Sequence, residues 1–100
     1  MMYQIISRMH KALENKTRLA IVSLLSVHSS IDFLELKELL NTTDGNLASH
    51  VAALEKESFL VIEKKIVGKK TNTSYQLTET GRAAFKEHLQ ALEELVKSSM

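Results

Sequence analysis

The sequence of 100 residues contains no cysteine, no proline and no tryptophan, and only three glycines. Without cysteine the chain cannot form disulfides, zinc ribbons, iron–sulfur sites or a thiol nucleophile. The absence of disulfides suits a reducing cytoplasm. The glycines are scattered, so they do not form a phosphate-binding loop. Because proline is absent, other residues must end the helices.

Long apolar segments are also absent. The longest, Leu19 to Val27, is interrupted by Ser23 and Ser26 and is far shorter than the ~20 residues that span a bilayer. The first residues include polar side chains, among them Arg8, where a secretory signal requires a clean apolar run. We therefore expect a cytoplasmic protein that does not enter a membrane.

Charge of either sign is nearly balanced, with 13 Lys and Arg against 12 Asp and Glu and a formal net charge of +1. This balance excludes a polyanion-seeking tail and an acidic solvating chain. Apolar residues make up 44% and charged residues 25%, which is typical of a folded domain. A chain of this length buries roughly 60–70% of its unfolded surface, which is enough for one core. We expect a single domain over residues 1–100.

Hydrophobic periodicity predicts the order α, α, short strand, α, α, β, β, α. Apolar residues at helical spacing predict a first helix over 2–14, followed by Asn15 as a cap. The segment 17–28 is apolar almost all round, which is typical of a helix contacted on several sides. The remaining expected elements are a very short strand at 31–33, helices over 34–41 and 44–57, strands over 59–67 and 74–78 joined by a basic loop at 68–73, and a last helix over 79–98 capped by Thr78.

This order, with a three-residue turn between two short helices and a basic hairpin after them, is that of a winged helix-turn-helix. The segments DFLELKELLNTTDGNLASHVAALEKESFLVIEKK and GKKTNTSYQLTETGRAAF resemble the small MarR/ArsR-like transcriptional regulators of bacteria and archaea. ALENKTRLAIVSLL is similar to the second helix of ArsR-type repressors, and the match covers roughly residues 12–90. The resemblance implies an α+β, mostly α fold with a two-stranded wing and long N- and C-terminal helices, which binds double-stranded DNA.

The helix over 44–57 is the expected recognition helix. Leu47, Val51 and Leu54 share the face that we expect to be buried. The opposite side carries Gly45, Ser49, Ala52, Ala53 and Lys56, flanked by Asn46 and His50. Small residues there would let the helix enter a major groove ~12 Å wide, where Asn46, Ser49 and His50 could reach base edges. His50 could instead reach a phosphate.

Backbone contacts are expected from two further segments. Thr42 and Thr43 add hydroxyls to the free N–H groups at the start of the recognition helix, which suits a phosphate oxygen. Residues 61–76 carry four lysines against one glutamate, a local charge of +3, and the expected wing contacts are Lys69, Lys70, Thr71 and Asn72. Arg18, at the start of the second helix, could contact the backbone or form a structural pair.

Structural interpretations stand beside these functional ones. Gly45 could serve tight packing at the turn, and His50 could be a half-buried packing residue. Thr43 and Asp44 could be helix caps first, and the carboxylate of Asp44 would repel a phosphate. The lysines of the wing could form a solvated turn that prevents aggregation. The acidic end of the recognition helix, at 55–57, also permits a protein-interaction module without specific DNA binding.

The sequence does not favour an enzyme, a cofactor or a metal site. The four histidines lie on different expected elements without a His-x-x-x-His spacing. His28, Ser30 and Asp32 are close in sequence, which is no evidence for a catalytic triad. One alternative is a metal site formed by His88 and Glu87 across a dimer.

Both terminal helices carry more apolar surface than one small domain is expected to cover. In the last helix this set is Phe85, Leu89, Leu92 and Val96, and the first helix has its own stripe. We expect a homodimer through the helices at about 2–14 and 79–98, with two recognition helices about one DNA turn apart. The alternative is an ordinary helix pair within one chain.

Overall fold

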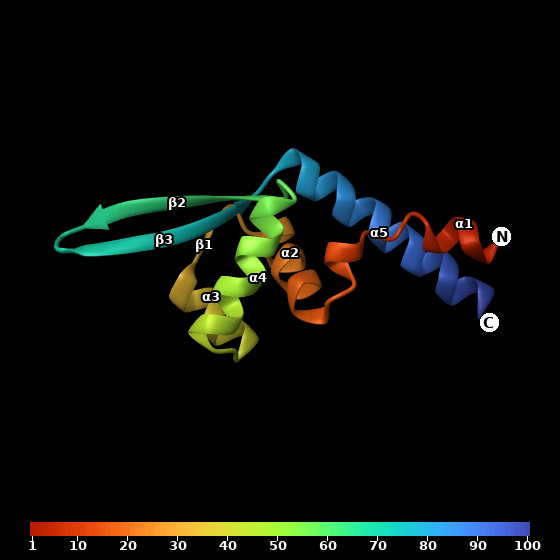
Figure 1. Cartoon of the computed structure of the whole chain (residues 1–100), viewed down its shortest axis with the longest axis horizontal. Coiled ribbons are helices and arrows are strands. Elements are labelled where there is room, and N and C mark those ends of the chain that lie inside the picture. Colours follow the sequence, from red (N-terminus) through yellow and green to blue (C-terminus); the bar gives the residue numbers. More distant parts are fainter.

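The computed structural model describes all 100 residues, Met1–Met100, as five α-helices, one turn of 3₁₀ helix and a three-stranded antiparallel sheet. In chain order these are α1 (Met2–Ile6), η1 (Lys11–Leu13), α2 (Lys16–Val27), β1 (Ile31–Asp32), α3 (Phe33–Leu40), α4 (Asp44–Lys56), β2 (Leu60–Val67), β3 (Lys70–Leu77) and α5 (Glu79–Ser98). The molecule measures 55 × 25 × 21 Å, with the β2–β3 hairpin at one end and both termini at the other (Figure 1). The predicted α+β, mostly helical class is confirmed.

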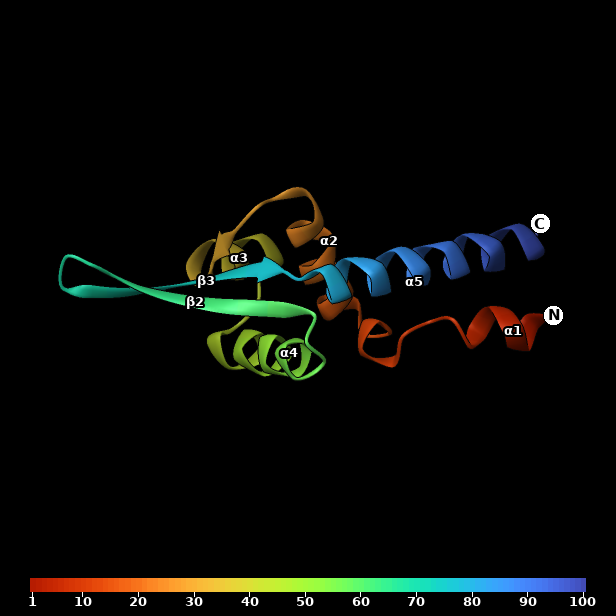
Figure 2. The ribbon, with the colours of Figure 1, turned by 90° about the horizontal axis from the view of Figure 1, so that it is seen from above.

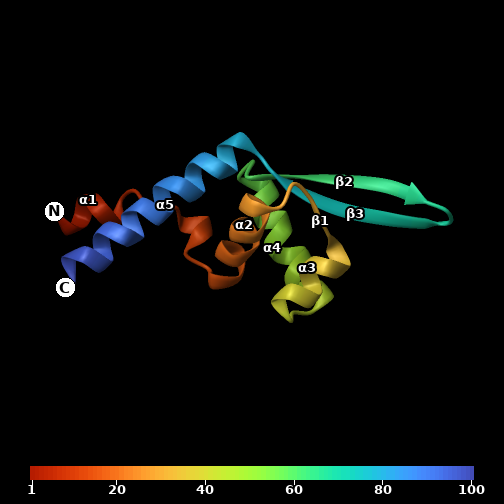
Figure 3. The ribbon, with the colours of Figure 1, turned by 180° about the vertical axis from the view of Figure 1, so that it is seen from behind.

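Helix α2 occupies the centre of the core. Asn15 caps it as predicted, because its Oδ1 accepts the backbone N–H groups of the second and third residues of the helix. Ile21, Val22 and Leu25 are at most 1% exposed. The helix packs against η1, α3, α4, β3 and α5, and from behind it lies between α5 and α4 (Figure 3). Contact on several sides explains why its sequence is apolar almost all round.

Helix α4 is buried along the predicted stripe. Leu47 and Leu54 are fully buried and Val51 is 3% exposed. The expectation for α3 is met only in part, because Leu36 is buried whereas Leu39 is 54% exposed. An eight-residue helix at the molecular surface turns one narrow face inward, and Leu39 falls outside it.

The sheet has the strand order β1-β3-β2. The predicted short strand exists as two residues, with Ile31 opposite Tyr75 and Asp32 opposite Ser74. On the other side of β3, Ile62 of β2 also lies opposite Tyr75. The buried Tyr75 therefore joins the base of the hairpin to the core.

The expected six-residue loop at 68–73 is wrong. The strands pair from Leu60 opposite Leu77 to Val67 opposite Lys70, which leaves a turn of two residues. Gly68 has a φ of +64°, the conformation that the first central position of a tight hairpin turn requires. Residues 70–73 of the expected loop therefore belong to β3.

The predicted continuous helix over 2–14 is also wrong. Helix α1 ends at Ile6, and His10 is extended with φ −87° and ψ 129°. The N–H of His10 donates to Nδ1 of His88 on α5 at 3.1 Å, while its own Nδ1 accepts the N–H of Ala12 at 3.1 Å. These bonds replace helical bonds, so the chain turns and Leu13 reaches the core.

Helix α5 extends from the core to the C-terminus, and α1 packs beside its far half (Figure 2). Arg8 and Glu94 form an ion pair between these helices. His88 and Ala91 are buried, whereas Leu89 is 42% and Val96 58% exposed, so part of the predicted apolar face is uncovered. No helix combines the length and apolar content that crossing a membrane would require.

The start of α5 is fixed by close packing against the segment before β2. Thr78 caps the helix as predicted, because its Oγ1 accepts the N–H of Gly81 at 2.9 Å. A Cβ added to Gly81 would lie 2.2 Å from the carbonyl oxygen of Phe59, which also accepts the N–H of Thr78. Only glycine allows the helix to approach the backbone this closely.

We predict that Gly81→Ala lowers the free energy of unfolding by about 1–3 kcal/mol, because the added methyl group overpacks the junction. Gly45→Ala is the matched control, since a Cβ there meets no atom within 4 Å and α4 gains helix propensity. Urea unfolding of both variants measures the difference. Equal free energies for the two variants would contradict the tight junction at Gly81.

We also predict that stability falls as the pH drops below about 6.5. Burial lowers the pKa of His88 below its ordinary value of 6.5, the charge of Glu14 opposes this, and His10 adds to the lowering. Below pH 6.5 the unfolded chain therefore binds more protons at His88 than the folded chain does, and protonation favours unfolding.

Thermal melts between pH 8 and pH 5 test this dependence. His88→Asn keeps an acceptor for the N–H of His10 but cannot be protonated, so it should lose less stability on acidification than the wild type. His28→Asn is the control, because His28 is exposed. A wild-type pH dependence in His88→Asn would show that His88 is not responsible.

Candidate nucleic-acid interface

Three residues, 41–43, join α3 to α4. Asn41 ends α3 in the left-handed conformation, with φ 48° and ψ 51°, which asparagine tolerates better than most residues. Thr43 then caps α4, because its Oγ1 accepts the N–H of Asn46 at 3.2 Å. The expectation that Thr43 acts as a cap is confirmed, and Asp44 is the first residue of the helix.

The side of α4 opposite its buried stripe is exposed and built from small residues. Gly45, Asn46 and Ser49 are all exposed, and none carries a charge. The alternative that Gly45 serves internal packing is not supported, since a Cβ there would meet no atom within 4 Å. The backbone at this position is therefore open to a surface outside the chain.

An ion pair connects the two helices on either side of the turn. Nζ of Lys37 lies 2.7 Å from Oδ1 of Asp44. Both side chains are partly exposed, so the pair contributes little to folding. Its main effect is to neutralise the carboxylate at the start of α4, which would otherwise repel an anion near Thr42 and Thr43.

His50 lies on the flank of α4 that faces α2, and it is half-buried. Nε of Arg18 donates to its Nδ1 at 3.1 Å. Burial, and secondly the charge of Arg18, lowers the pKa of His50 below its ordinary value of 6.5. The imidazole is therefore mainly neutral at pH 7, and because its Nδ1 accepts from Arg18, its ring hydrogen lies on Nε2. Both structural expectations, packing for His50 and pairing for Arg18, are met.

The hairpin concentrates positive charge at the end of the molecule. Lys64, Lys65, Lys69 and Lys70 are all exposed. Nζ of Lys65 lies 3.0 Å from Oε1 of Glu63, whereas the other three lysines form no ion pair within the chain. The hairpin therefore presents three uncompensated cations.

The predicted hairpin residues divide between two faces. Lys64 lies opposite Thr73, and directly opposite side chains share a face. Thr71 lies two residues from Thr73 and therefore on this same face, which turns toward α4. The other face carries Lys70 and Asn72. The predicted wing contacts Thr71 and Asn72 therefore lie on opposite faces of the hairpin. In the expected flexible loop they could have faced the same way.

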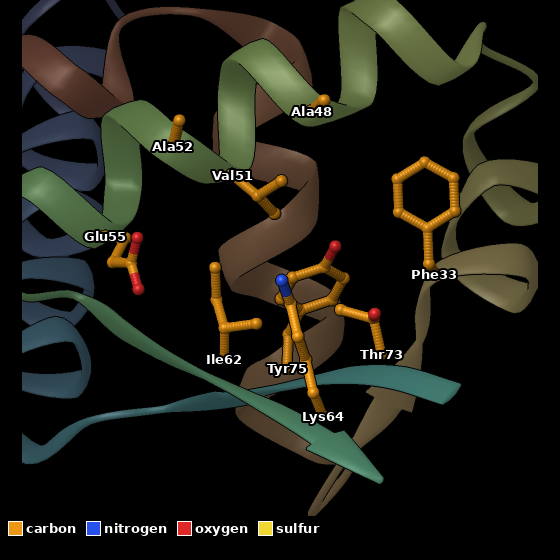
Figure 4. Close-up of a pocket in the computed structure, with 9 residues that line it drawn as sticks. All are labelled: Phe33, Ala48, Val51, Ala52, Glu55, Ile62, Lys64, Thr73 and Tyr75. Atoms are coloured by element: carbon orange, nitrogen blue, oxygen red, sulfur yellow. The ribbon is translucent and has the colours of Figure 1, made fainter. Parts of the chain in front are cut away.

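A groove of about 410 Å³ separates α4 from the hairpin (Figure 4). Ala48 and Ala52 border it on α4, and Lys64 extends into it from β2 beside Tyr75. Burial, and to a smaller extent the charge of Glu55, raises the pKa of Tyr75, so its hydroxyl stays protonated. The groove places a lysine beside the exposed side of α4.

Two lysines near this surface, Lys64 and Lys37, were not among the predicted DNA contacts. Lys64 follows Leu60 and Ile62 on one face of β2, and the two-residue period of a strand would have placed it there. Lys37 is a helical residue whose partner Asp44 lies beyond the turn, and no local pattern indicates that pair.

His88, which the metal alternative required, is 1% exposed, and its Nδ1 already accepts a hydrogen bond. No group of three or more His, Asp or Glu side chains is placed to hold a metal ion.

The model of the winged helix DNA-binding domain family matches residues 17–96. The chain belongs to this family. Helices α3 and α4 form its helix-turn-helix, and the β2–β3 hairpin is its wing. Members of this family bind DNA and regulate transcription, which is a binding function and not catalysis.

Similar proteins agree with this assignment. An uncharacterized protein of Methanocaldococcus jannaschii is 34% identical over 88 residues, which cover 88% of this chain and 96% of that protein. A transcriptional regulator homologue from Pyrococcus horikoshii OT3 superposes with a TM-score of 0.84 and 25% identity. The superposition covers 96% of this winged helix chain and 93% of the Pyrococcus chain. A MarR-like transcriptional regulator from Thermotoga maritima has a TM-score of 0.62 and 29% identity, with coverages of 97% and 71%. The predicted resemblance to MarR-like regulators is confirmed.

Proposed function

We propose that this winged helix protein is a homodimeric transcriptional regulator that binds a pseudo-palindromic site in double-stranded DNA. The recognition helix α4 would lie in the major groove, and the wing would contact the minor groove or the phosphate backbone. The observation that carries the proposal is the exposed side of α4, where Gly45, Asn46 and Ser49 are small and uncharged. The fold itself does not require a glycine at position 45.

Small side chains allow α4 to approach base pairs closely. An α-helix with its side chains is about 10–12 Å across, and the major groove is ~12 Å wide. Asn46 carries an amide that can pair with the N6 and N7 edge of adenine, and Ser49 carries a hydroxyl that can donate or accept. Both lie on the exposed side of the helix, so we assign base recognition to them.

The turn before α4 suits the DNA backbone. The Oγ1 of Thr43 accepts the capping bond, which leaves its hydroxyl hydrogen free to donate to a phosphate oxygen. Thr42 adds a second hydroxyl, and the start of α4 offers its first backbone N–H groups. The ion pair with Lys37 offsets the negative charge of Asp44 at this position.

The wing supplies the charge that α4 lacks. Lys69 and Lys70 are exposed at its tip without acidic partners, and Lys64 extends between the wing and α4. Because Thr71 and Asn72 lie on opposite faces of β3, a wing inserted edge-on would contact both walls of a minor groove.

Helices α1 and α5 would form the dimer. Tyr3 is 81% and Ile6 50% exposed on α1, and Leu89 and Val96 remain exposed on α5. These helices extend away from the core at the end opposite the wing (Figure 1). Pairing them across a two-fold axis would bury this apolar surface and present two recognition helices.

A selection of bound duplexes from fragmented genomic DNA tests the function as a whole. We expect enrichment of sites with two-fold related halves whose centres lie about 10–10.5 base pairs apart, or a multiple of that distance. A pool that shows no enrichment would contradict sequence-specific binding and favour the alternative of a protein-interaction module.

We predict that the double variant Lys69→Ala and Lys70→Ala binds every duplex more weakly than the wild type. Each lost phosphate contact should reduce the slope of log affinity against log salt by about one unit. Lys86→Ala with Lys97→Ala makes the same charge change on α5 and should keep the wild-type slope. If the wing variant also keeps that slope, the wing does not contact phosphates.

We predict that Asn46→Ala relaxes base preference at one position of each half-site. Loss of a bidentate contact should cost about 1–3 kcal/mol on the selected site and almost nothing on a scrambled duplex. A selection repeated with the variant measures the preference, and Gln90→Ala on α5 is the matched amide control. An unchanged preference would remove Asn46 from base recognition.

We predict that Leu89→Glu with Val96→Glu converts the dimer to a monomer in sedimentation equilibrium. The affinity for the full site should fall at least about a hundredfold, because the two half-sites are no longer bound together. Val27→Glu is the control, since Val27 is 76% exposed at the end of α2 and is not one of the apolar residues proposed for the interface. A dimer that survives the double substitution would place the interface elsewhere.

A further inference from the structure

Arg18 and His50 form a side-chain pair that the folded domain leaves incomplete. Nε of Arg18 donates to Nδ1 of His50 at 3.1 Å, which joins the first turn of α2 to the middle of α4. Both side chains are half-buried. No carboxylate of the chain lies within ion-pair distance of Arg18, so its charge is unmatched.

Most of the hydrogen-bond donors of this pair have no acceptor within the protein. A guanidinium carries five N–H donors, and only the one on Nε is used. Because Nδ1 of His50 accepts, its ring hydrogen lies on Nε2, and this donor is also unused. None of these unpartnered nitrogens is fully buried, so the donors are at least partly open to solvent.

The position of the pair on α4 indicates which part of a DNA duplex it would face. Ser49 lies on the exposed side, opposite the stripe of Leu47 and Val51, whereas His50 lies on the flank next to α2. A helix in the major groove presents its outer side to the base edges and its flanks to the two sugar–phosphate strands. With α4 in the major groove, His50 and Arg18 would therefore lie beside one of these strands.

We propose that Arg18 and His50 form a phosphate clamp, in which the guanidinium fork of Arg18 and the Nε2–H of His50 donate to the DNA backbone beside the recognition helix. The clamp rests on the proposed function and assigns His50 to the backbone instead of to bases. Arginine suits this position, because its planar fork matches phosphate oxygens in pairs. Arg18 is also a positioning residue, since its bond to Nδ1 fixes the tautomer of His50.

Binding measurements with two matched pairs of variants test the clamp. Arg18→Gln removes the charge and the fork. Arg82→Gln makes the same charge change on α5, where Arg82 donates to the carbonyl of Ser26 near the other end of α2 at 3.2 Å. His50→Leu removes both hydrogen bonds, whereas His50→Gln can accept from Arg18 and still donate outward. Thermal melts confirm that each variant is folded.

We expect Arg18→Gln to lower the affinity for the selected site and for a scrambled duplex alike, by about tenfold each. Its salt slope should fall by about one unit, while Arg82→Gln keeps the wild-type slope. His50→Leu should weaken both duplexes, and His50→Gln should restore affinity to within about threefold of the wild type. None of these variants should change the base preference.

A scan of single uncharged methylphosphonate linkages through the selected site adds a readout that a purely structural pair would not change. At one linkage per half-site the substitution should weaken the wild type but have a clearly smaller effect on Arg18→Gln, because the guanidinium contact with that phosphate is already lost and only the contact of His50 remains. Imidazole nitrogen-15 NMR should show the Nε2–H tautomer of His50 in the wild type and a mixture in Arg18→Gln.

Three results would overturn the clamp. Lower melting temperatures with wild-type salt slopes in Arg18→Gln and His50→Leu would make the pair structural only. A changed base preference in His50→Leu would make His50 a base-reading residue and leave the proposed function intact. Failure of the wild type to bind any duplex would contradict the proposed function itself, and the clamp with it.

Discussion

The burial of one narrow stripe of α4 is the constraint on which the rest of the structure depends. Leu47, Val51 and Leu54 hold the helix against the core, and each buried side chain of this kind contributes about 1.5–3 kcal/mol. The same contacts fix the rotation of α4 about its axis. Asn46 and Ser49 are thereby turned outward, and His50 toward α2. If α4 were buried on both sides, it would have no exposed side to present. Different residues of the same helix therefore provide the packing and the proposed DNA contacts.

The proposed contacts with DNA and with a second copy lie at opposite ends of an elongated molecule. Helix α5 begins where Gly81 packs on the carbonyl of Phe59, and it extends toward the end where α1 lies beside it. The bond from His10 to His88 anchors the N-terminal segment along the way. A rigid junction at each of these points would set the separation of two recognition helices in a dimer.

Local signals in the sequence were sufficient for most of the fold. Asn15, Thr43 and Thr78 cap helices as predicted because a cap acts within three residues, and the buried stripe of α4 follows from helical period alone. The break at His10 depends on a hydrogen bond to His88, 78 residues away, so the helical periodicity of residues 2–14 does not indicate it. The sequence predicts a long loop in place of the tight turn at Gly68, because the polar residues after Gly68 are as typical of a loop as of an exposed strand. In the site, exposure of Asn46 and Ser49 followed from periodicity, whereas the pairing of His50 with Arg18 spans 32 residues and needed the structure.

The central claim is that α4 and the wing bind DNA with sequence preference. Fluorescence polarisation with the duplex most enriched by selection, against a scrambled duplex of equal length at two salt concentrations, tests it most directly. The account predicts tighter binding to the selected duplex and a steep loss of affinity for both duplexes as salt rises. Equal and weak binding to the two duplexes would contradict it.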